Sequence, residues 1–300
     1  MAALRLLDAH ALIRSDDPAR YPFQPLGAAL EPREIEHGLN TTQLLEALDR
    51  SRVERAVLVQ RARLYGFDNR YVCDSAVALP ERLACVCQLN ARDPQCAQQA
   101  RELVRKSGAV GLRFMEPVKG DGLDWLDSHG ARLVWRVACE EGVPVSLHFF
   151  PWNRRAGLEV LRARLTELAP RALVLDSLAG TAVDAGAPDY GTDELLERVM
   201  EFAGARVKFT AMILARLVAA KRSAEGLLAH LVQRFGASRV LWGSDVLAPG
   251  QSYESAVRLV LEASTGLGTA EREQVLYGTA AALYPTRQPG PGAPASLPLR

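Results

Sequence analysis

The sequence predicts an α/β protein with a single (β/α)8 TIM barrel over residues 1–285. Short apolar runs alternate with longer segments of helical periodicity, and they recur roughly every 25–50 residues. Most of these runs are continuously apolar, which is typical of parallel strands covered on both faces. Eight such units in a chain of 300 residues fit a closed barrel, whose typical size is about 250 residues.

The apolar runs give the order of the strands. A doubly wound open sheet is the alternative fold, but it usually has a glycine-rich turn after its first strand, and residues 10–14 contain no glycine. The expected strands are Arg5–Ala9, Arg55–Gln60, Leu83–Leu89, Ala109–Arg113, Val143–His148, Ala172–Asp176, Ala205–Thr210 and Arg239–Ser244.

The segments between these runs carry helix signals. Thr41 is a cap-forming residue before an apolar stripe, Pro94 stands in a tolerated first-turn position, and Gly142 suits a helix end. A long first loop, 14–40, is expected to cover the barrel mouth, and 286–300 is a Pro/Gly-rich segment expected to be disordered. The expected helices are 41–48, 93–105, 128–141, 155–168, 193–202, 224–235, 252–264 and 270–283.

Composition limits the partners and the compartment. The net charge is +1, and no cluster of Lys and Arg marks one face, so neither nucleic acid nor an anionic membrane is an expected partner. No apolar run approaches the roughly 20 residues of a membrane helix. Arg5 and Asp8 interrupt the apolar N-terminal run, so no signal peptide is expected, and we predict a cytoplasmic protein.

The chain has five cysteines, and none forms a CxxC pair. Most fall within expected helices or strands, which is typical of buried, reduced thiols in a reducing compartment. They are Cys73, Cys85, Cys87, Cys96 and Cys139.

Polar residues at the strand ends suggest an active site, because functional groups of a (β/α)8 barrel come from the C-terminal ends of its strands. His10 and His148 stand at the ends of the first and fifth strands, and Asp245 follows the eighth. One histidine at a strand end is more often structural, whereas two histidines that converge with a carboxylate favour function. The remaining histidines, His37, His129 and His230, are expected at the surface.

Several motifs resemble those of the amidohydrolase-2 family. They are Asp-Ala-His at 8–10, Gly-Val-Pro-Val-Ser-Leu-His at 142–148 and Arg-Val-Leu-Trp-Gly-Ser-Asp at 239–245, supported by 108–113 and 207–209. They occur in the right order, and the resemblance extends from about residue 4 to residue 283. It implies a barrel of the amidohydrolase type, closest in character to relatives of 2-pyrone-4,6-dicarboxylate lactonase. Other members of the family are metal-dependent hydrolases and decarboxylases.

The sequence departs from the metal-dependent members at two positions. Their pattern implies a second histidine at position 12 and another at position 177, where this chain has Leu12 and Ser177. His10, His148 and Asp245 could still provide the three protein ligands of a catalytic zinc site. We expect no tightly bound metal and no other cofactor, with a weakly held divalent metal such as zinc as the alternative.

The retained residues suggest a hydrolytic mechanism. Asp245 is the candidate general base for a water molecule, with His10 and His148 holding that water or polarising the substrate carbonyl. Arg113 is a candidate donor to the developing oxyanion. Asp245 could instead cap a helix, and Arg113 could instead pair with Glu116 or another acidic group inside the barrel.

The segment after the fifth strand suggests a substrate-binding wall. Arg154 could hold a substrate carboxylate, and the aromatic residues suit a ring-containing substrate. Loop packing and helix capping are the alternative role for 152–154, and Ser177 could be a substrate contact or a neutral space-filler. Asp8 and Asp176 are expected to hydrogen-bond within the barrel. The proposed wall comprises Phe149, Phe150, Trp152, Asn153 and Arg154.

Three classes of function remain open. The first is a hydrolase of a lactone or amide bond in a small acidic or aromatic metabolite, which we favour. The second is a decarboxylase-type lyase of the same family. The third is a non-catalytic binding relative that has lost metal ligands. The expected partner is a small-molecule substrate, and the sequence leaves self-association open.

Overall fold

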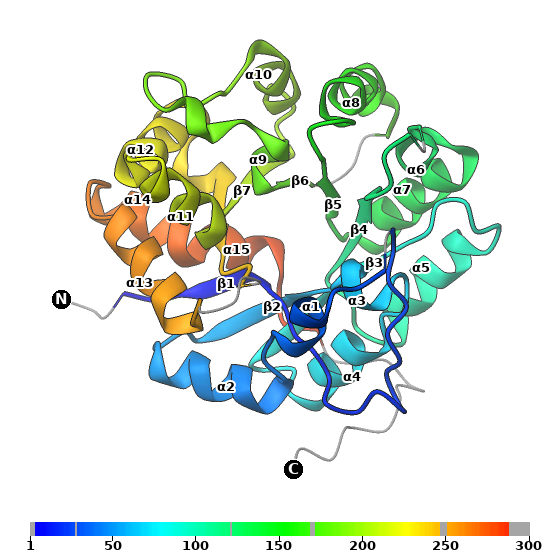
Figure 1. Cartoon of the computed structure of the whole chain (residues 1–300). Coiled ribbons are helices and arrows are strands. Elements are labelled where there is room, and N and C mark those ends of the chain that lie inside the picture. The colour runs from blue at the N-terminus through cyan, green and yellow to red at the C-terminus, as the bar shows by residue number, and fades with distance from the viewer. Residues whose placement is uncertain (1–3, 28, 121, 169–171, 247–250, 288–300) are drawn as a thin grey trace.

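A computed structural model describes residues 4–27, 29–120, 122–168, 172–246 and 251–287. Its eight parallel strands form one sheet in sequence order, β1 to β8, curled into a nearly closed TIM barrel (Figure 1). The strands are β1 (Leu7–Ala11), β2 (Arg55–Val59), β3 (Leu83–Gln88), β4 (Gly111–Met115), β5 (Val145–His148), β6 (Leu173–Asp176), β7 (Ala205–Thr210) and β8 (Val240–Gly243).

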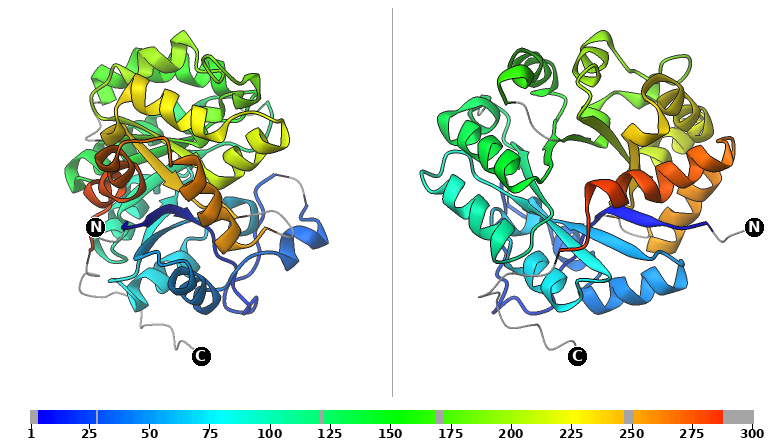
Figure 2. Two further views of the ribbon diagram at one scale, coloured as in Figure 1. Left: turned by 90° about the vertical axis from the view of Figure 1, so that its left-hand side faces the viewer. Right: turned by 180° about the vertical axis from the view of Figure 1, so that it is seen from behind.

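The helices surround the strands on the outside (Figures 1 and 2). Cap-forming side chains begin several of them, as Ser128 does by accepting a hydrogen bond from the Ala131 amide. The α-helices are α1 (Pro32–Glu36), α2 (Thr41–Arg50), α3 (Ala62–Tyr65), α4 (Arg70–Ala78), α5 (Cys96–Arg105), α6 (Asp124–Asp127), α7 (His129–Glu141), α8 (Arg154–Leu168), α9 (Ser177–Gly180), α10 (Glu194–Met200), α11 (Ala211–Ala219), α12 (Ala224–Phe235), α13 (Tyr253–Ala263), α14 (Thr269–Glu273) and α15 (Thr279–Leu283).

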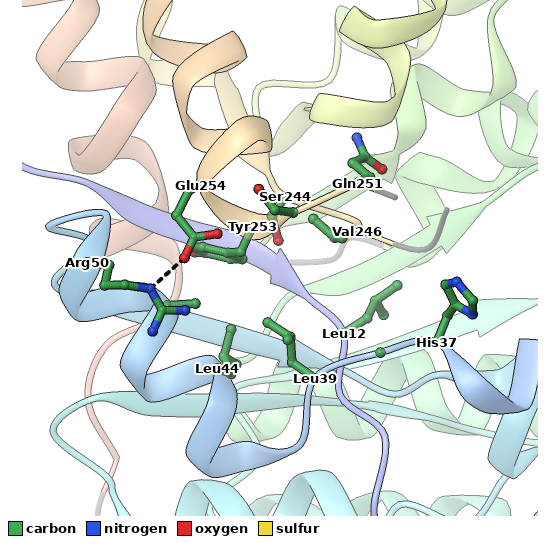
Figure 3. Close-up of a pocket in the computed structure, with 13 residues that line it drawn as sticks. Leu12, His37, Leu39, Leu44, Arg50, Ser244, Val246, Gln251, Tyr253 and Glu254 are labelled. Carbon is green, nitrogen blue, oxygen red and sulfur yellow. Dashed lines mark hydrogen bonds and ion pairs between the residues drawn. The ribbon is translucent and has the colours of Figure 1, made fainter. Parts of the chain in front are cut away.

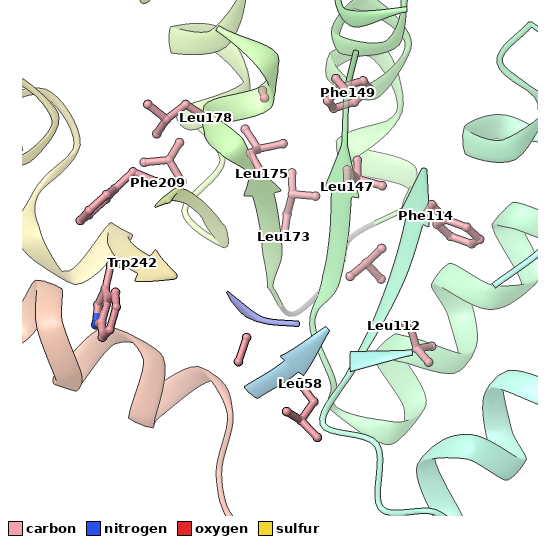
Figure 4. Packing of buried hydrophobic residues seen from close by; sticks show 14 of the residues in the cluster. Leu58, Leu112, Phe114, Leu147, Phe149, Leu173, Leu175, Leu178, Phe209 and Trp242 are labelled. Atoms are coloured by element: carbon pink, nitrogen blue, oxygen red, sulfur yellow. The ribbon is translucent and has the colours of Figure 1, made fainter. Parts of the chain in front are cut away.

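Two hydrophobic layers hold the barrel together. Large side chains on the outer faces of the strands pack against the helices, among them Leu112, Phe114, Leu147 and Trp242 (Figure 4). Burying each such side chain contributes about 1.5–3 kcal/mol. Smaller side chains fill part of the interior, together with a tyrosine that follows α15. The inner cluster comprises Leu7, Ala9, Val57, Val59, Ala84, Val86, Val110, Val174, Leu241, Ala280 and Tyr284.

Strand register explains where the polar side chains lie. On β6, Leu173 and Leu175 belong to the outer layer and Val174 to the inner cluster, so Asp176 also faces the interior. In the same way, Val207 and Phe209 of β7 face outward, which leaves Lys208 inside. Inward positions near the strand ends are therefore polar, although the strands themselves are apolar.

The eight expected strands and the barrel are confirmed, with differences at the ends of strands. β1 begins and ends two residues later than predicted, so His10 lies within the strand, and β4 continues to Met115 beyond Arg113. Residues 288–300 of the expected tail lie outside the described residues. Across the described ranges, no helix has the length and apolar character needed to cross a membrane.

Candidate active site

His10 and Asp245 lie together where the first and last strands meet. The distance between His10 Nε2 and Asp245 Oδ1 is 3.8 Å, and both side chains are buried. The Asp245 backbone amide donates to the His10 carbonyl at 2.9 Å, which fixes the two residues side by side. Gly243 allows this approach, because a Cβ atom there would stand 2.2 Å from His10 Cβ.

Asp8 holds this junction in place. Its Oδ1 accepts hydrogen bonds from the amides of His10 and Ser244, both at 2.9 Å, and its Oδ2 accepts from the Tyr253 hydroxyl at 3.0 Å. These contacts tie β1 to the segment after β8 and to α13. They match the expectation that Asp8 forms hydrogen bonds within the barrel.

A buried charge cluster lies next to these residues. Asp176 contacts Lys208 Nζ at 2.9 Å through Oδ1 and Arg113 Nε at 2.8 Å through Oδ2. Burial alone would raise the pKa of Asp176, but the two cations outweigh it and hold that pKa below its usual range. Lys208 also donates to the Ala9 carbonyl at 3.1 Å. The cluster therefore links β1, β4, β6 and β7.

The partner of Arg113 in this structure corresponds to one of the two roles considered for it. Arg113 pairs with an acidic group inside the barrel, and that group is Asp176. Glu116 instead accepts from Arg92 at 2.6 Å. The Arg113 Nη1 atom lies 3.4 Å from Gln88 Oε1.

The site shifts the proton affinities of its three candidate residues. Burial raises the pKa of Asp245 to about 7, although the positive charges of Arg113 and Lys208 oppose this rise. Burial, together with the Arg113 charge, lowers the pKa of His148 to about 4. The pKa of His10 also lies well below its usual range, because of burial and the charge of Lys208. Both imidazoles are therefore neutral at pH 7.

Two segments at the mouth have left-handed backbone conformations. Asp245 has φ 47°, and Ser177, Leu178 and Ala179 have φ values of 49°, 53° and 55°. Each non-glycine residue in this region costs about 1–2 kcal/mol, so such conformations persist only where the surroundings hold them. They place Asp245 and the turn after β6 at the ends of their strands.

Several buried polar atoms of these residues have no hydrogen-bond partner among the described residues. They include Nδ1 of both His10 and His148, Nε2 of Gln88 and Oγ of Ser177. Buried polar atoms without protein partners usually bind water or a ligand. The strand ends therefore retain hydrogen-bonding capacity for a bound molecule.

The aromatic part of the proposed wall adjoins His148. The ring of Phe150 meets the His148 ring edge-on, with a centroid distance of 4.8 Å, and stacks on Trp152 at 4.6 Å. Trp152 is 44% exposed, which makes it the outermost part of this stack. Phe149 instead points away from the barrel into the outer layer and contacts Trp125. The expectation that Phe149 lines the mouth is therefore wrong.

Arg154 and Asn153 have intramolecular partners. The Arg154 guanidinium pairs with Asp193 at 2.6 Å and donates to the Ala179 carbonyl at 3.1 Å. The Asn153 side chain accepts from the Phe150 amide at 2.8 Å and donates to the Glu116 carbonyl. In this structure both residues fix loops, in line with the alternative role considered for them.

The ligand atoms of the three candidate metal-binding residues do not all lie close together in this structure. His10, His148 and Asp245 are not among the groups of three ligand atoms that lie within 4.8 Å of one another in the described ranges. The buried cations Lys208 and Arg113 already lower the proton affinity of both histidines and would repel a further cation. Leu12, at the position of an expected histidine, lines an apolar pocket.

That pocket lies beside the junction of β1 and β8 (Figure 3). It has a volume of about 170 Å³, and Leu12, Leu39, Leu44 and Val246 form its apolar part. His37 also lines it, at the edge of the long first loop. An ion pair between Arg50 and Glu254, with 2.7 Å between the atoms, bounds the outer side.

Sequence analysis assigned no role to Lys208, which the structure places in the buried charge cluster. The available signal was a lysine inside an otherwise apolar strand. Lysine is almost never fully buried unless it is paired. Its inward position and its pairing with Asp176 follow from the alternation along β7.

The chain belongs to the amidohydrolase family Amidohydro_2, whose model matches residues 7–286. The comparison with proteins of curated function finds no match. The family assignment confirms the resemblance seen in the sequence and places the chain in an enzyme family.

Solved structures share the fold at low sequence identity. An amidohydrolase from Burkholderia multivorans with bound zinc has a TM-score of 0.72 and 20% identity, with 93% of this chain and 99% of that one covered. A probable 2-pyrone-4,6-dicarboxylic acid hydrolase from Acinetobacter baumannii with bound citric acid has a TM-score of 0.71 and 18% identity. The alignment covers 93% of this chain and 98% of that one. A 2,6-dihydroxybenzoate decarboxylase from Rhizobium has a TM-score of 0.61 and 16% identity, with 94% of this chain and 98% of that one covered. At these identities the likeness establishes the fold alone.

Proposed function

We propose that the protein hydrolyses a lactone or amide bond in a small acidic or aromatic metabolite, with Asp245 as the general base. The observation that carries this proposal is a buried carboxyl group with a pKa raised to about 7, next to His10 at the barrel mouth. A general base works best when its pKa lies near the working pH. An ordinary surface aspartate would be a much weaker base.

The chemistry needs one water molecule and no other co-reactant. Asp245 takes a proton from that water as its oxygen attacks the substrate carbonyl, and the carbonyl oxygen becomes an oxyanion. The neutral rings of His10 and His148 each carry one N–H donor and one acceptor, so they can hold the water and polarise the carbonyl. When the tetrahedral intermediate collapses, the C–O or C–N bond breaks and the leaving group takes up the proton that Asp245 removed from the water, which returns Asp245 to its ionised form.

The buried charges suit this step. As Asp245 becomes neutral, the negative charge moves to the substrate oxygen, so the total charge of the site does not change. Fixed cations near the developing charge stabilise it without reorganisation. Arg113 and Lys208 provide two such cations, and Asp176 balances one of them.

We propose that this reaction runs without a tightly bound metal and without another cofactor. The support is the spacing of the ligand atoms and the two buried cations, together with Leu12 and Ser177 at the positions of expected histidines. Elemental analysis of the purified protein tests this proposal directly. One equivalent of zinc or manganese bound through nitrogen and oxygen atoms would contradict it.

Acid release from a panel of lactones, pyrone carboxylates and aryl amides, followed in a pH-stat, tests the reaction. We expect at least one carboxylated compound to release acid, with a rate that rises with pH through about 7 as Asp245 ionises. Asp245→Asn should lose this activity, and Asp49→Asn, at an exposed position, should keep it. Full activity in Asp245→Asn would refute the role of the base.

Carbon dioxide release without acid release would instead support a decarboxylase. Two of the structurally similar proteins, from Novosphingobium aromaticivorans and Rhizobium, are decarboxylases. Binding of panel compounds with no turnover would favour the non-catalytic alternative. Binding of the panel compounds to Asp245→Asn, measured by calorimetry, separates these outcomes, because a pure binding site would not need an ionisable group at position 245.

A further inference from the structure

Three cysteine side chains gather outside the barrel, on the opposite face of β3 from the barrel interior. Cys73 comes from α4, and Cys85 and Cys87 come from β3, which packs against that helix (Figure 1). We call these three residues the thiol cluster. Their Sγ atoms all lie within 4.8 Å of one another, with 3.5 Å between Cys73 and Cys87 and 4.0 Å between Cys73 and Cys85.

The alternation of β3 separates this cluster from the candidate active site. Cys85 and Cys87 belong to the outer hydrophobic layer, whereas Ala84 and Val86 belong to the inner cluster. All three thiols are buried, and none is in a disulfide. The thiol cluster therefore lies between sheet and helix, on the opposite side of the strand from the barrel interior.

The sulfur spacing matches that of a metal–thiolate centre. Sulfur atoms bound to one zinc ion at about 2.3 Å stand roughly 4 Å apart, and Cys73 Sγ lies 3.5 Å from Cys87 Sγ and 4.0 Å from Cys85 Sγ. A structural disulfide needs two sulfurs at about 2.05 Å and would leave the third thiol unused. Three sulfurs that all lie within 4.8 Å of one another favour a shared ion over a disulfide.

We propose that the thiol cluster is a binding site for a soft, thiophilic divalent metal ion, held by three cysteine sulfurs in trigonal geometry. Within the described ranges, no other His, Cys, Asp or Glu atom joins this group of ligands. Soft thiolate ligands select soft metals over magnesium or calcium. Metal binding releases thiol protons to solvent, so the affinity rises with pH.

Titration of the reduced, metal-free full chain with Cd²⁺ tests the site, because sulfur-to-cadmium charge transfer gives an ultraviolet absorption that nitrogen and oxygen ligands do not. We expect this absorption to saturate at one ion per chain and thermal unfolding to move to higher temperature. Cys85→Ala should weaken binding at least tenfold. Cys96→Ala, at a buried cysteine outside the cluster, should leave it unchanged.

Two further measurements keep the test decisive. His10→Ala should retain the sulfur-to-cadmium absorption, which separates this site from the candidate active site. X-ray absorption of the cadmium-loaded wild-type chain should show three sulfur neighbours, and this does not depend on whether a variant folds. The proposal is overturned by a folded, reduced chain that gives no such absorption, by equal binding in Cys85→Ala, or by a metal shell without sulfur.

Discussion

Replacing Asp245 with asparagine should stabilise the protein while removing its proposed activity. The pKa of Asp245 rises from its ordinary value of 3.8 to about 7 in the folded state. Each tenfold difference in proton affinity corresponds to about 1.4 kcal/mol, so ionised Asp245 costs the folded state about 4 kcal/mol. Asparagine cannot ionise, and it also tolerates the φ of 47° at this position better than most residues.

The sign of the pH dependence follows from this shift. A carboxyl group whose pKa is raised on folding favours the folded state at low pH, and this advantage is lost as the pH rises from 3.8 through about 7. The advantage of Asp245→Asn over the wild type should therefore be about 4 kcal/mol at pH 8 and about 2 kcal/mol at pH 5. At pH 8 the thermal midpoint should rise by on the order of 10 °C.

Urea-induced unfolding of both proteins between pH 5 and pH 9 measures this difference. Asp49→Asn is the matched control, because Asp49 is 66% exposed, and its effect should stay within about 0.5 kcal/mol at every pH. An asparagine variant no more stable than the wild type at pH 8 would refute the reasoning. A stability gap that does not shrink toward pH 5 would also refute it.

Three further predictions concern the stability of the folded chain. Asp176→Asn leaves two buried cations without their partner and should destabilise the chain by about 3–5 kcal/mol in urea unfolding; adding Lys208→Met should recover part of that loss, and no recovery would contradict the pairing. Gly243→Ala places a Cβ atom 2.2 Å from His10 Cβ and should cost about 1–3 kcal/mol and most of the activity, so a fully active and equally stable variant would show that the strands are not in contact there. Lys221→Gly, at an exposed φ of 55° after α11, should raise the unfolding free energy by about 1 kcal/mol, and a lower thermal midpoint would contradict this.

The fold was predictable because its strands are short, apolar and regularly spaced. The positions of His10 and Asp245 followed from topology, since parallel strands bring their C-terminal ends to one rim. The ends of β1 were less predictable, because the register shifts between Asp8 and Ala11. A shift of this kind depends on tertiary contacts, such as those of the Asp8 carboxylate, and leaves no local pattern.

The partners of individual side chains were beyond the reach of the sequence. Arg154 looked free to bind a substrate, but it pairs with Asp193, which is 39 residues away. The left-handed turn that begins at Ser177 contains three non-glycine residues, so composition gave no warning of it. Cys85 and Cys87 share one face of β3 through their i, i+2 spacing, but bringing Cys73 to them needed the contact of α4 with β3.

The junction held by Asp8 has a consequence for how the protein is made. His10 and Ser244 are 234 residues apart, so a ribosome that adds about 5–20 residues per second exposes β1 for roughly ten to fifty seconds before its neighbour β8 emerges. During that interval the open edge of β1 is free to pair with other chains. Nascent or truncated forms of this protein are therefore expected to depend on chaperones more than the finished barrel does.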